Sequence, residues 1–283
     1  MATDADPPGD VPSDELPADL PDDLPDDLSG DLEVIGRIAD SSNHSVLARL
    51  TNRPSEHVIY KPVRGERPLW DFPDGTLAGR EVAAYLVSRL GGWDLVPLTV
   101  LRDGPLGAGA VQRWIGNPLA PVADDADVTV IPSGTVPDGW IHVLDGLTPT
   151  GEPVTVVHRD REDVRSLSVL DAVLNNSDRK GSHCLRDGSG RLWAIDHGLC
   201  FHPTPKLRTV LWGWAGRAFT RPDLDRLRRF RSELSRPEAR AAFALLLPED
   251  DVVALESRVE HLLEEGRHPL PSPDWPPVPW PPV

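Results

Sequence analysis

Residues 174–199 read LNNSDRKGSHCLRDGSGRLWAIDHGL. The Asp-Gly pair at 187–188, between two short apolar runs, is a strong signal for a β-hairpin. Because a hairpin brings its two open ends side by side, the polar segments around Asp178 and Asp196 are expected to share one patch, with His183 between them. The stretch therefore predicts two carboxylates that a tight turn holds at a fixed separation.

Two converging aspartates suit phosphoryl transfer that depends on a divalent ion. One carboxylate binds the metal, and the other orients the attacking hydroxyl and accepts its proton. The chemistry also needs a lysine on a strand to contact the phosphates and an acid on a helix to hold that lysine. Lys61 and Glu81 meet these requirements. Only three of the 29 basic residues are lysines, which indicates that arginine does not suffice where a lysine is retained.

The segments NNSDRKGSH and AIDHGLCF resemble the catalytic and metal-binding segments of the phosphatidylinositol 3-/4-kinase family. In that family the catalytic segment reads approximately D-R-x-x-x-N and is followed, after a hairpin, by A-I-D-N/H-G-L-x-F. The resemblance covers residues 34–230 and is most specific at 174–201. It implies a bacterial member of this group, with an atypical bilobal kinase fold that uses ATP and Mg²⁺ or Mn²⁺.

The resemblance also implies roles for individual residues. Asp178 is the catalytic aspartate, and Asp196 is the principal metal ligand. Lys61 contacts the nucleotide phosphates and pairs with Glu81. The residues that match the adenine-binding connector more loosely are Val111, Gln112 and Trp114.

The sequence departs from the family pattern at two places. His183 stands where a metal-binding asparagine is expected, and a neutral imidazole suits Mn²⁺ better than Mg²⁺. The turn in IADSSNHSV has no glycine, so we expect its backbone amides at Ser41, Ser42 and Asn43 to receive the phosphates instead. The histidines and cysteines near Asp196 fit no common zinc spacing.

Around these motifs, the pattern of the first 116 residues predicts a sheet with one helix. The segments with strand patterning are 32–40, 44–50, 57–63, 95–103 and 107–115. The first two are separated by SSN and are expected to pair as a hairpin. A helix is predicted over 75–92, with Thr76 as its N-cap and two glycines at its end.

The rest of the chain is mainly helical in pattern. Residues 117–158 are expected to form a loop-rich insertion with one or two strands. A helix is predicted over 160–176, with Asp160 as its N-cap. Residues 223–266 are predicted to be mostly helix, interrupted near the two prolines of this segment.

The predicted fold class is therefore α+β, with a bilobal kinase-like architecture and a cleft between the lobes. The expected parts are a disordered acidic arm (1–33), a β-rich nucleotide-binding lobe (34–116), a mainly helical catalytic lobe (117–266) and a Pro/Trp-rich tail (267–283). Trp275 and Trp280 are open to two interpretations, in which the tail docks on the body of the protein or on a partner.

Charge and composition exclude several classes of protein. The net charge is −16, of which the twelve acids of residues 1–33 leave −4 for the remainder. Neither part has the basic field of a nucleic-acid or anionic-membrane binder. The sequence has no apolar run of transmembrane length and no secretory signal. With only Cys184 and Cys200, we expect free thiols in the cytoplasm.

The sequence thus predicts an ATP-dependent phosphotransferase that moves the γ-phosphate to a hydroxyl. The acceptor stays open between a lipid or inositol-like headgroup, a protein Ser/Thr and a small molecule. Two alternatives also remain open. One is a nucleotide-binding pseudokinase or scaffold whose tails engage protein partners, which the His183 substitution favours. The other is transfer of AMP on the same fold.

Overall fold

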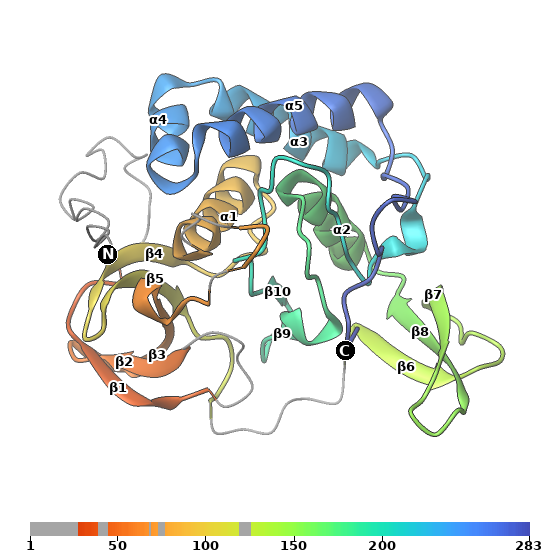
Figure 1. The fold of residues 1–283 in the computed structure, drawn as a ribbon, viewed down its shortest axis with the longest axis horizontal. Helices are drawn as coiled ribbons and strands as arrows, with labels where there is room; N and C mark the ends of the chain where they lie inside the picture. Colours follow the sequence, from red (N-terminus) through yellow and green to blue (C-terminus); the bar gives the residue numbers. More distant parts are fainter. Residues whose placement is uncertain (1–27, 39–44, 68, 73–76, 119–125) are drawn as a thin grey trace, which may run out of the picture.

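The computed structural model describes residues 28–38, 45–67, 69–72, 77–118 and 126–283. Most of the predicted acidic arm lies outside these residues, as do Ser41, Ser42, Asn43 and the predicted helix cap Thr76. The described chain forms a β-rich N-terminal lobe and a mainly helical C-terminal lobe (Figure 1). This arrangement confirms the predicted α+β fold class.

An antiparallel five-stranded sheet, in the order β1-β2-β3-β5-β4, forms the N-terminal lobe. Its strands are β1 (Leu32–Arg37), β2 (Val46–Leu50), β3 (Arg53–Pro62), β4 (Thr99–Gly104) and β5 (Gly107–Arg113). All five match predicted strands, and β1 pairs with β2 as expected. Apolar residues alternate along β2, where Val46, Ala48 and Leu50 are buried, because successive side chains of a strand point to opposite faces.

One helix, α1 (Leu77–Gly91), packs between this sheet and the helices of the C-terminal lobe (Figure 1). It contacts protein on both sides, so nearly all of its side chains are buried. Its first turn is capped from a distance, because the carboxylate of Glu66 accepts hydrogen bonds from the backbone N–H groups of Leu77 (2.9 Å) and Ala78 (2.8 Å). The helix that carries Glu81 is thereby anchored to the loop after β3.

Four helices build the C-terminal lobe. They are α2 (Glu162–Leu174), α3 (Arg221–Leu234), α4 (Pro237–Leu246) and α5 (Glu249–Glu265). The two predicted interruptions are confirmed, because Pro237 begins α4 and Pro248 is the N-cap of α5. The predicted cap of α2 is wrong. Arg161 is the N-cap residue, and the Asp160 carboxylate instead accepts a hydrogen bond from the Trp214 indole (3.3 Å).

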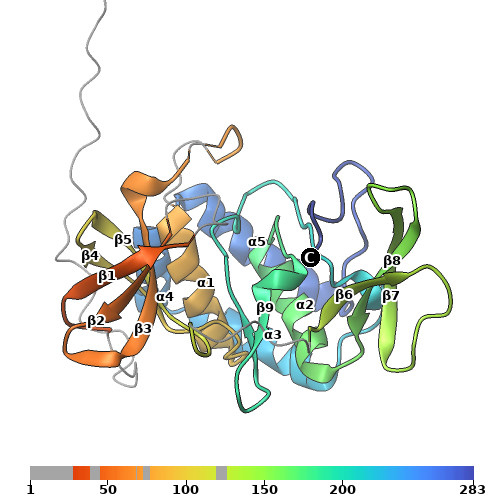
Figure 2. The same ribbon diagram turned by 90° about the horizontal axis from the view of Figure 1, so that it is seen from below.

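The insertion contains more regular structure than its sequence pattern predicts. Strands β6 (Val128–Pro132), β7 (Trp140–Leu147) and β8 (Pro153–Arg159) form an antiparallel sheet in the order β6-β8-β7. This sheet projects from one side of the helical lobe (Figure 2). The expectation of one or two strands was too low, because β7 is exposed or half-buried along its length and lacks the apolar alternation of a strand that packs on a core.

The predicted hairpin is confirmed, with β9 (Cys184–Arg186) antiparallel to β10 (Leu192–Ala194). The Asp187 carboxylate closes its turn by accepting hydrogen bonds from the backbone N–H of Ser189 (2.9 Å) and the Trp193 indole (2.8 Å). Cys184 at the open end is directly opposite Ala194. The segments that carry Asp178 and Asp196 therefore leave the hairpin side by side.

A buried ion pair holds these two segments together. Arg179 is fully buried, and its guanidinium donates three hydrogen bonds of 3.0–3.1 Å to the Asp171 carboxylate of α2. It also donates to the carbonyl of Ile195 (2.9 Å) and to Nε2 of His197 (2.8 Å). One side chain thus connects α2, the segment around Asp178 and the segment around Asp196.

The C-terminal tail returns to the body of the protein. The carbonyl of Pro277 accepts hydrogen bonds from the backbone N–H of Thr209 (3.0 Å) and the Trp212 indole (2.7 Å). The carbonyl of Pro282 accepts one from the backbone N–H of Gly181 (2.8 Å). Of the two dockings left open by the sequence, the structure shows the one on the body for the tail backbone and for Trp275, which contacts Lys206, whereas Trp280 is 78% exposed.

We predict that Asp171→Asn destabilises the protein by about 3–5 kcal/mol, because the variant leaves the buried guanidinium of Arg179 without a counter-charge. Urea unfolding measures the change. Asp225→Asn is the matched control, since Asp225 pairs with Arg228 on an exposed surface and its loss should cost less than about 1 kcal/mol. Equal losses in the two variants would contradict the role given to the buried pair.

Candidate active site

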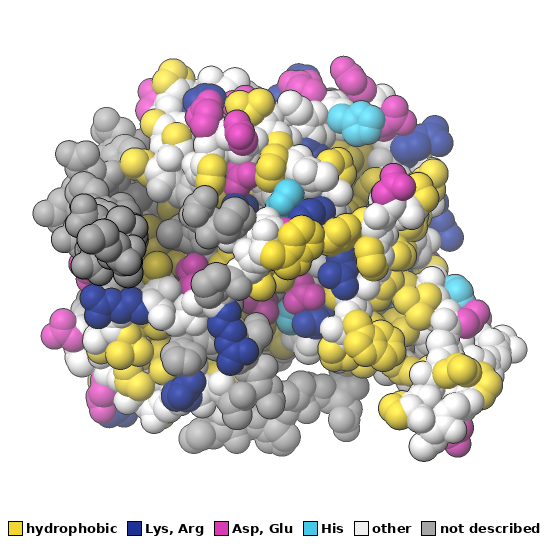
Figure 3. Space-filling view, in the orientation of Figure 1, with side chains coloured by type: hydrophobic (Ala, Val, Ile, Leu, Met, Phe, Trp, Pro, Cys, Tyr) yellow, Lys and Arg dark blue, Asp and Glu magenta, His cyan; other side chains and the backbone are white. Residues whose placement is uncertain are grey.

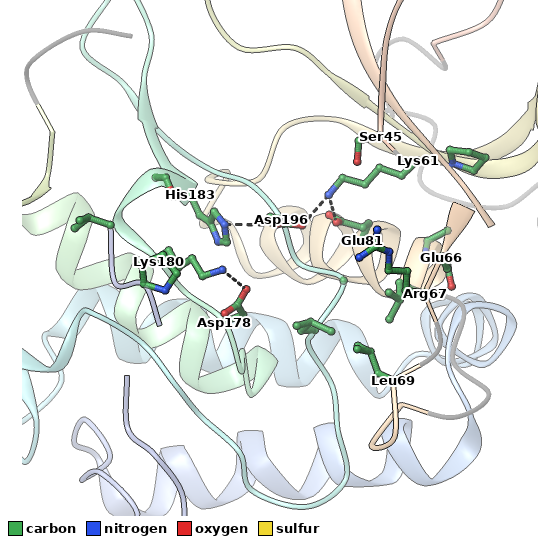
Figure 4. Close-up of a pocket in the computed structure, with 18 residues that line it drawn as sticks. Ser45, Lys61, Glu66, Arg67, Leu69, Glu81, Asp178, Lys180, His183 and Asp196 are labelled. Carbon is green, nitrogen blue, oxygen red and sulfur yellow. Dashed lines mark hydrogen bonds and ion pairs between the residues drawn. The ribbon is translucent and has the colours of Figure 1, made fainter. Parts of the chain in front are cut away.

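A cleft of about 630 Å³ separates the two lobes and is lined by residues from both of them and from the C-terminal tail. The lining includes Lys61 from β3, Glu81 from α1, and Asp178, His183 and Asp196 from the C-terminal lobe (Figure 4). The structure thus brings the five residues that carry the sequence prediction into one cavity. Its volume is in the range that ordinary small-molecule ligands occupy.

Lys61 is the electrostatic link across the cleft. Its ammonium contacts the Glu81 carboxylate and lies 2.9 Å from Oδ1 of Asp196 (Figure 4). Burial opposes the charged ammonium, but the two neighbouring carboxylates together raise the pKa of Lys61 above its ordinary value. The lysine is therefore a fixed positive charge between the sheet, α1 and the segment after β10.

Glu81 faces the cleft and does not pair along its own helix. One carboxylate oxygen contacts Lys61, and the other accepts a hydrogen bond from the backbone N–H of His197 (3.1 Å). Its sequence neighbour Arg80 instead pairs with Asp251 of α5 (2.6 Å). Glu81 therefore positions both the lysine and the backbone next to Asp196.

Asp196 has a left-handed backbone conformation, with φ of 61°. This unusual conformation for a non-glycine residue is common at functional sites. Its carboxylate is about half exposed to the cleft, at 49%. The positive charge of Lys61 holds the pKa of Asp196 well below its usual range. Asp196 is therefore an anion over the whole physiological pH range.

The environment of Asp178 has the opposite effect. Burial raises the pKa of this carboxyl, and the ammonium of Lys180, at 3.0 Å, acts in the other direction. The backbone N–H of Asp178 donates to the side-chain carbonyl of Asn176 (2.9 Å), whose amide in turn donates to Asp171 (3.0 Å). The buried pair around Asp171 thus also supports the backbone of Asp178.

His183 is buried at the rear of the cleft, with Nε2 3.4 Å from Oδ2 of Asp196. Burial lowers the pKa of His183 to about 4, so its imidazole is neutral at physiological pH and able to ligate a metal. Its buried Nδ1 has no hydrogen-bond partner in the described part of the chain.

The donor set of His183 and Asp196 fits a divalent ion that takes its other ligands from phosphates and water. Within the described residues, no group of three His, Cys, Asp or Glu side chains is placed to hold a metal. Such an ion would therefore depend on the nucleotide. The zinc arrangement is also disfavoured, since in the described part of the chain neither free thiol, Cys184 nor Cys200, belongs to such a group.

The residues predicted at the adenine-binding connector, Gln112 and Trp114, do not lie in the lining of the cleft. Gln112 is buried in the sheet and donates its side-chain amide to Thr99 (2.8 Å). The backbone N–H of Trp114 donates to the carbonyl of His57 (2.9 Å). Neither residue lines the cleft around Lys61, and their contact with a nucleotide stays a prediction.

Sequence reasoning missed two groups of residues at this site. Asn176 and Arg179 support the backbone around Asp178. No pattern pointed to Arg179, because an arginine inside a polar segment is usually exposed. Lys180 lines the cleft beside Asp178. The scarcity of lysine, which drew attention to Lys61, was a signal that applied equally to Lys180.

Comparison with known proteins adds a family and a fold. The chain is 43% identical over 256 residues to Protein Rv2133c of Mycobacterium tuberculosis (strain ATCC 25618 / H37Rv), an alignment that covers 88% of this chain and 91% of the other. The chain belongs to the family of this mycobacterial protein. No protein-family model matches it.

Two solved kinases are similar in structure. The golgi casein kinase has a TM-score of 0.50 and 12% sequence identity, with 84% of this chain and 73% of that chain covered. A Helicobacter pylori proinflammatory kinase, CtkA, has a TM-score of 0.45 and 10% identity, with 84% and 93% covered. The first likeness shows that this chain has a kinase-like fold. None of the helices in the described ranges is both long and apolar enough to cross a membrane.

The opposite pKa shifts of the two aspartates predict opposite effects of removing their charges. Asp196 has a lowered pKa, so it stabilises the fold above about pH 4 and loses this contribution as the pH falls. Asp178 has a raised pKa, so its ionised form costs stability above the same pH. Asp196→Asn should destabilise the protein more at pH 7 than at about pH 2.5, because the contribution of Asp196 is lost only as the pH falls through its lowered pKa. Asp178→Asn should be more stable, relative to the unsubstituted protein, at pH 7 than at the lower pH. Denaturant unfolding at both values measures these differences, and shifts of the same sign in the two variants would contradict the assignment.

Proposed function

We propose that this protein is an ATP-dependent phosphotransferase that moves the γ-phosphate of ATP to a hydroxyl acceptor. The observation that carries the proposal is the contact of Lys61 with both Glu81 and Asp196 in the cleft that also contains Asp178. Phosphoryl transfer needs a fixed cation, an anionic metal ligand and a carboxylate for the attacking hydroxyl in one place. The kinase-like fold agrees with this reading.

Each residue has a distinct part in this proposal. Lys61 binds the nucleotide phosphates and is kept in place by Glu81. Asp196 and His183 hold the divalent ion, which neutralises charge on the phosphates when bound. Asp178 orients the acceptor hydroxyl and accepts its proton, a task that suits a carboxyl whose pKa is raised by burial.

The charge of the cleft favours a neutral acceptor. Three cationic side chains line it, namely Lys61, Arg67 and Lys180, and four carboxylates oppose them, namely Glu66, Glu81, Asp178 and Asp196. A polyphosphorylated inositol headgroup would meet a cleft already occupied by the phosphates of ATP and without an excess of positive charge. We therefore favour a protein Ser/Thr or another uncharged hydroxyl over the inositol lipid that the sequence resemblance implies. The two thiols are free and buried, which agrees with the cytoplasmic location that we propose.

A second candidate function is nucleotide binding without turnover. It is favoured by His183, because an imidazole replaces the expected amide ligand and the described residues supply few donors to a metal. The same fold would also accommodate transfer of AMP in place of phosphate. The label that is transferred from ATP separates these three activities.

Asp178→Asn should lower the rate of γ-phosphate transfer by about 10²–10⁴-fold, since the amide cannot accept a proton. The measurement is turnover of γ-labelled ATP by the full chain with Mg²⁺ or Mn²⁺, with Asp225→Asn as the surface control. Transfer of α-label would identify an AMP transferase. Thermal stabilisation by ATP without any turnover would overturn the enzyme assignment and leave a nucleotide-binding protein.

The metal ligands make a separate prediction. Asp196→Asn should abolish the part of ATP binding that depends on a divalent ion, because it removes the anionic ligand. His183→Asn should shift the preferred metal from Mn²⁺ toward Mg²⁺, because an amide oxygen replaces an imidazole nitrogen. Calorimetric titration of ATP with each metal and with EDTA tests both variants. Unchanged metal dependence in Asp196→Asn would refute its role.

A further inference from the structure

The third lysine of the chain, Lys206, is not among the residues that line the cleft and lies beside three aromatic rings. Lys206 is only 7% exposed, and its ammonium lies 3.0 Å from Oδ2 of Asp71. It also lies 5.0 Å from the ring centres of Trp70 and Trp275 and 6.0 Å from that of Phe72. We call this group of five residues the Lys206 clasp. Its contacts combine an ion pair with cation–π attraction, which strengthens when the cation is desolvated.

The clasp joins three parts of the chain that are far apart in sequence. Lys206 is in the segment after Asp196, and its backbone N–H donates to the side-chain carbonyl of Asn175 at the end of α2 (2.9 Å). Trp70, Asp71 and Phe72 belong to the N-terminal lobe, in the loop between β3 and α1. Trp275 belongs to the C-terminal tail. The clasp is therefore a tie between the two lobes that also fastens the tail.

Both of the segments that the clasp holds continue into the cleft. The loop between β3 and α1 contributes Arg67 and Leu69 to the lining, and the tail contributes Pro281 and Val283. Figure 2 shows this loop and the tail at the same edge of the molecule. In the space-filling view, hydrophobic side chains lie beside acidic, basic and histidine side chains near the middle of the molecule (Figure 3).

The tail is fitted closely to the segment that carries Asp178. Gly181, three residues after Asp178, donates its backbone N–H to the carbonyl of Pro282 (2.8 Å). A Cβ atom at Gly181 would lie 2.9 Å from Cβ of Val128 and 3.2 Å from Cγ1 of Val283, so a larger residue there would collide with Val128 of β6 and crowd Val283 of the tail. The glycine permits the tail to lie against the segment that carries the proposed catalytic base.

From these contacts we infer that the Lys206 clasp holds the loop of residues 69–72 and the tail of residues 275–283 as the acceptor-side wall of the cleft. The wall determines which hydroxyl compounds reach Asp178, and it keeps bulk water away from this carboxylate. This inference rests on the proposed function for the identity of the reacting group. The effect of the clasp on access to the cleft is measurable without catalysis.

The ammonium of Lys206 pairs with one carboxylate and lies over three rings, so it combines an ion pair with cation–π attraction. In a chain whose cations are almost all arginine, two of the three lysines line the cleft. The third, Lys206, fastens two segments that continue into the cleft.

The first experiment measures access to the cleft by chemical labelling. An amine-reactive acetylating reagent is applied to the full chain under limiting conditions, and the modification of Lys180 and Lys61 is quantified by mass spectrometry. In Lys206→Met and in Trp275→Ala, the initial rate at Lys180 should rise at least about threefold, because the local opening exposes the acceptor side. The rate at Lys61, held by two carboxylates, should change less.

Circular dichroism shows whether Lys206→Met is folded. If it is not, Asp71→Asn replaces it in the test, because this milder variant keeps the three rings. Arg236→Met is the matched control, since it removes an exposed ion pair with Glu233 and should leave labelling of Lys180 unchanged. Labelling of Lys180 that is unchanged in all folded clasp variants would overturn the inference. This outcome does not depend on whether the protein transfers phosphate.

The second experiment measures the rate of ATP hydrolysis, in which water is the acceptor. If the wild-type chain turns over ATP, the clasp variants should hydrolyse ATP about threefold to tenfold faster, because water reaches Asp178 more freely. Their thermal stabilisation by Mn²⁺-ATP should be unchanged. Faster labelling of Lys180 without faster hydrolysis would overturn the acceptor-side role of the wall. A wild-type chain without any turnover would refute the proposed function and leave the clasp to be decided by labelling.

Discussion

The ion pair between Arg179 and Asp171 organises the C-terminal lobe of this protein around the two aspartates of the cleft. A fully buried guanidinium requires a counter-charge and an acceptor for each of its donors, and here it obtains them from α2 and from the segment that follows β10. Arg179 directly follows Asp178, and its acceptors Ile195 and His197 flank Asp196. The same side chain therefore fixes the spacing of the two aspartates on which the proposed chemistry depends.

The two lobes are joined by charge as well as by apolar packing. Lys61 and Glu81 meet Asp196 across the cleft, Arg80 reaches Asp251 on α5, and Lys206 reaches back to Asp71. Each pair is partly or fully shielded from water, which makes it stronger than an exposed pair and more costly to break. The cleft between the lobes is thus a space bounded by ion pairs, and the nucleotide that we propose would compete with Glu81 and Asp196 for Lys61.

The two aspartates differ in their surroundings and so in what they are able to do. Asp196 lies beside a permanent cation and stays ionised, as a metal ligand must. Asp178 is more buried, and its pKa is raised although Lys180 lies within 3.0 Å. When two carboxyl groups have environments that move their pKa values apart, the pair separates into a group for proton transfer and a group that stays charged. The chemistry that we propose uses this difference.

The sequence by itself predicted most of the elements and the five residues that the structure brings together in one cleft. The Asp-Gly turn specified the hairpin, and the rare Lys61 pointed to its contact with Glu81. Both are signals that local pattern and composition carry. The sequence did not determine the burial of Arg179, the partners of Lys206 or the third strand of the insertion. Asp71 and Lys206 are 135 residues apart, and Arg179 resembles a surface cation until the surrounding chain encloses it. These features depend on which distant surfaces exclude water from each other, and only the tertiary structure decides that.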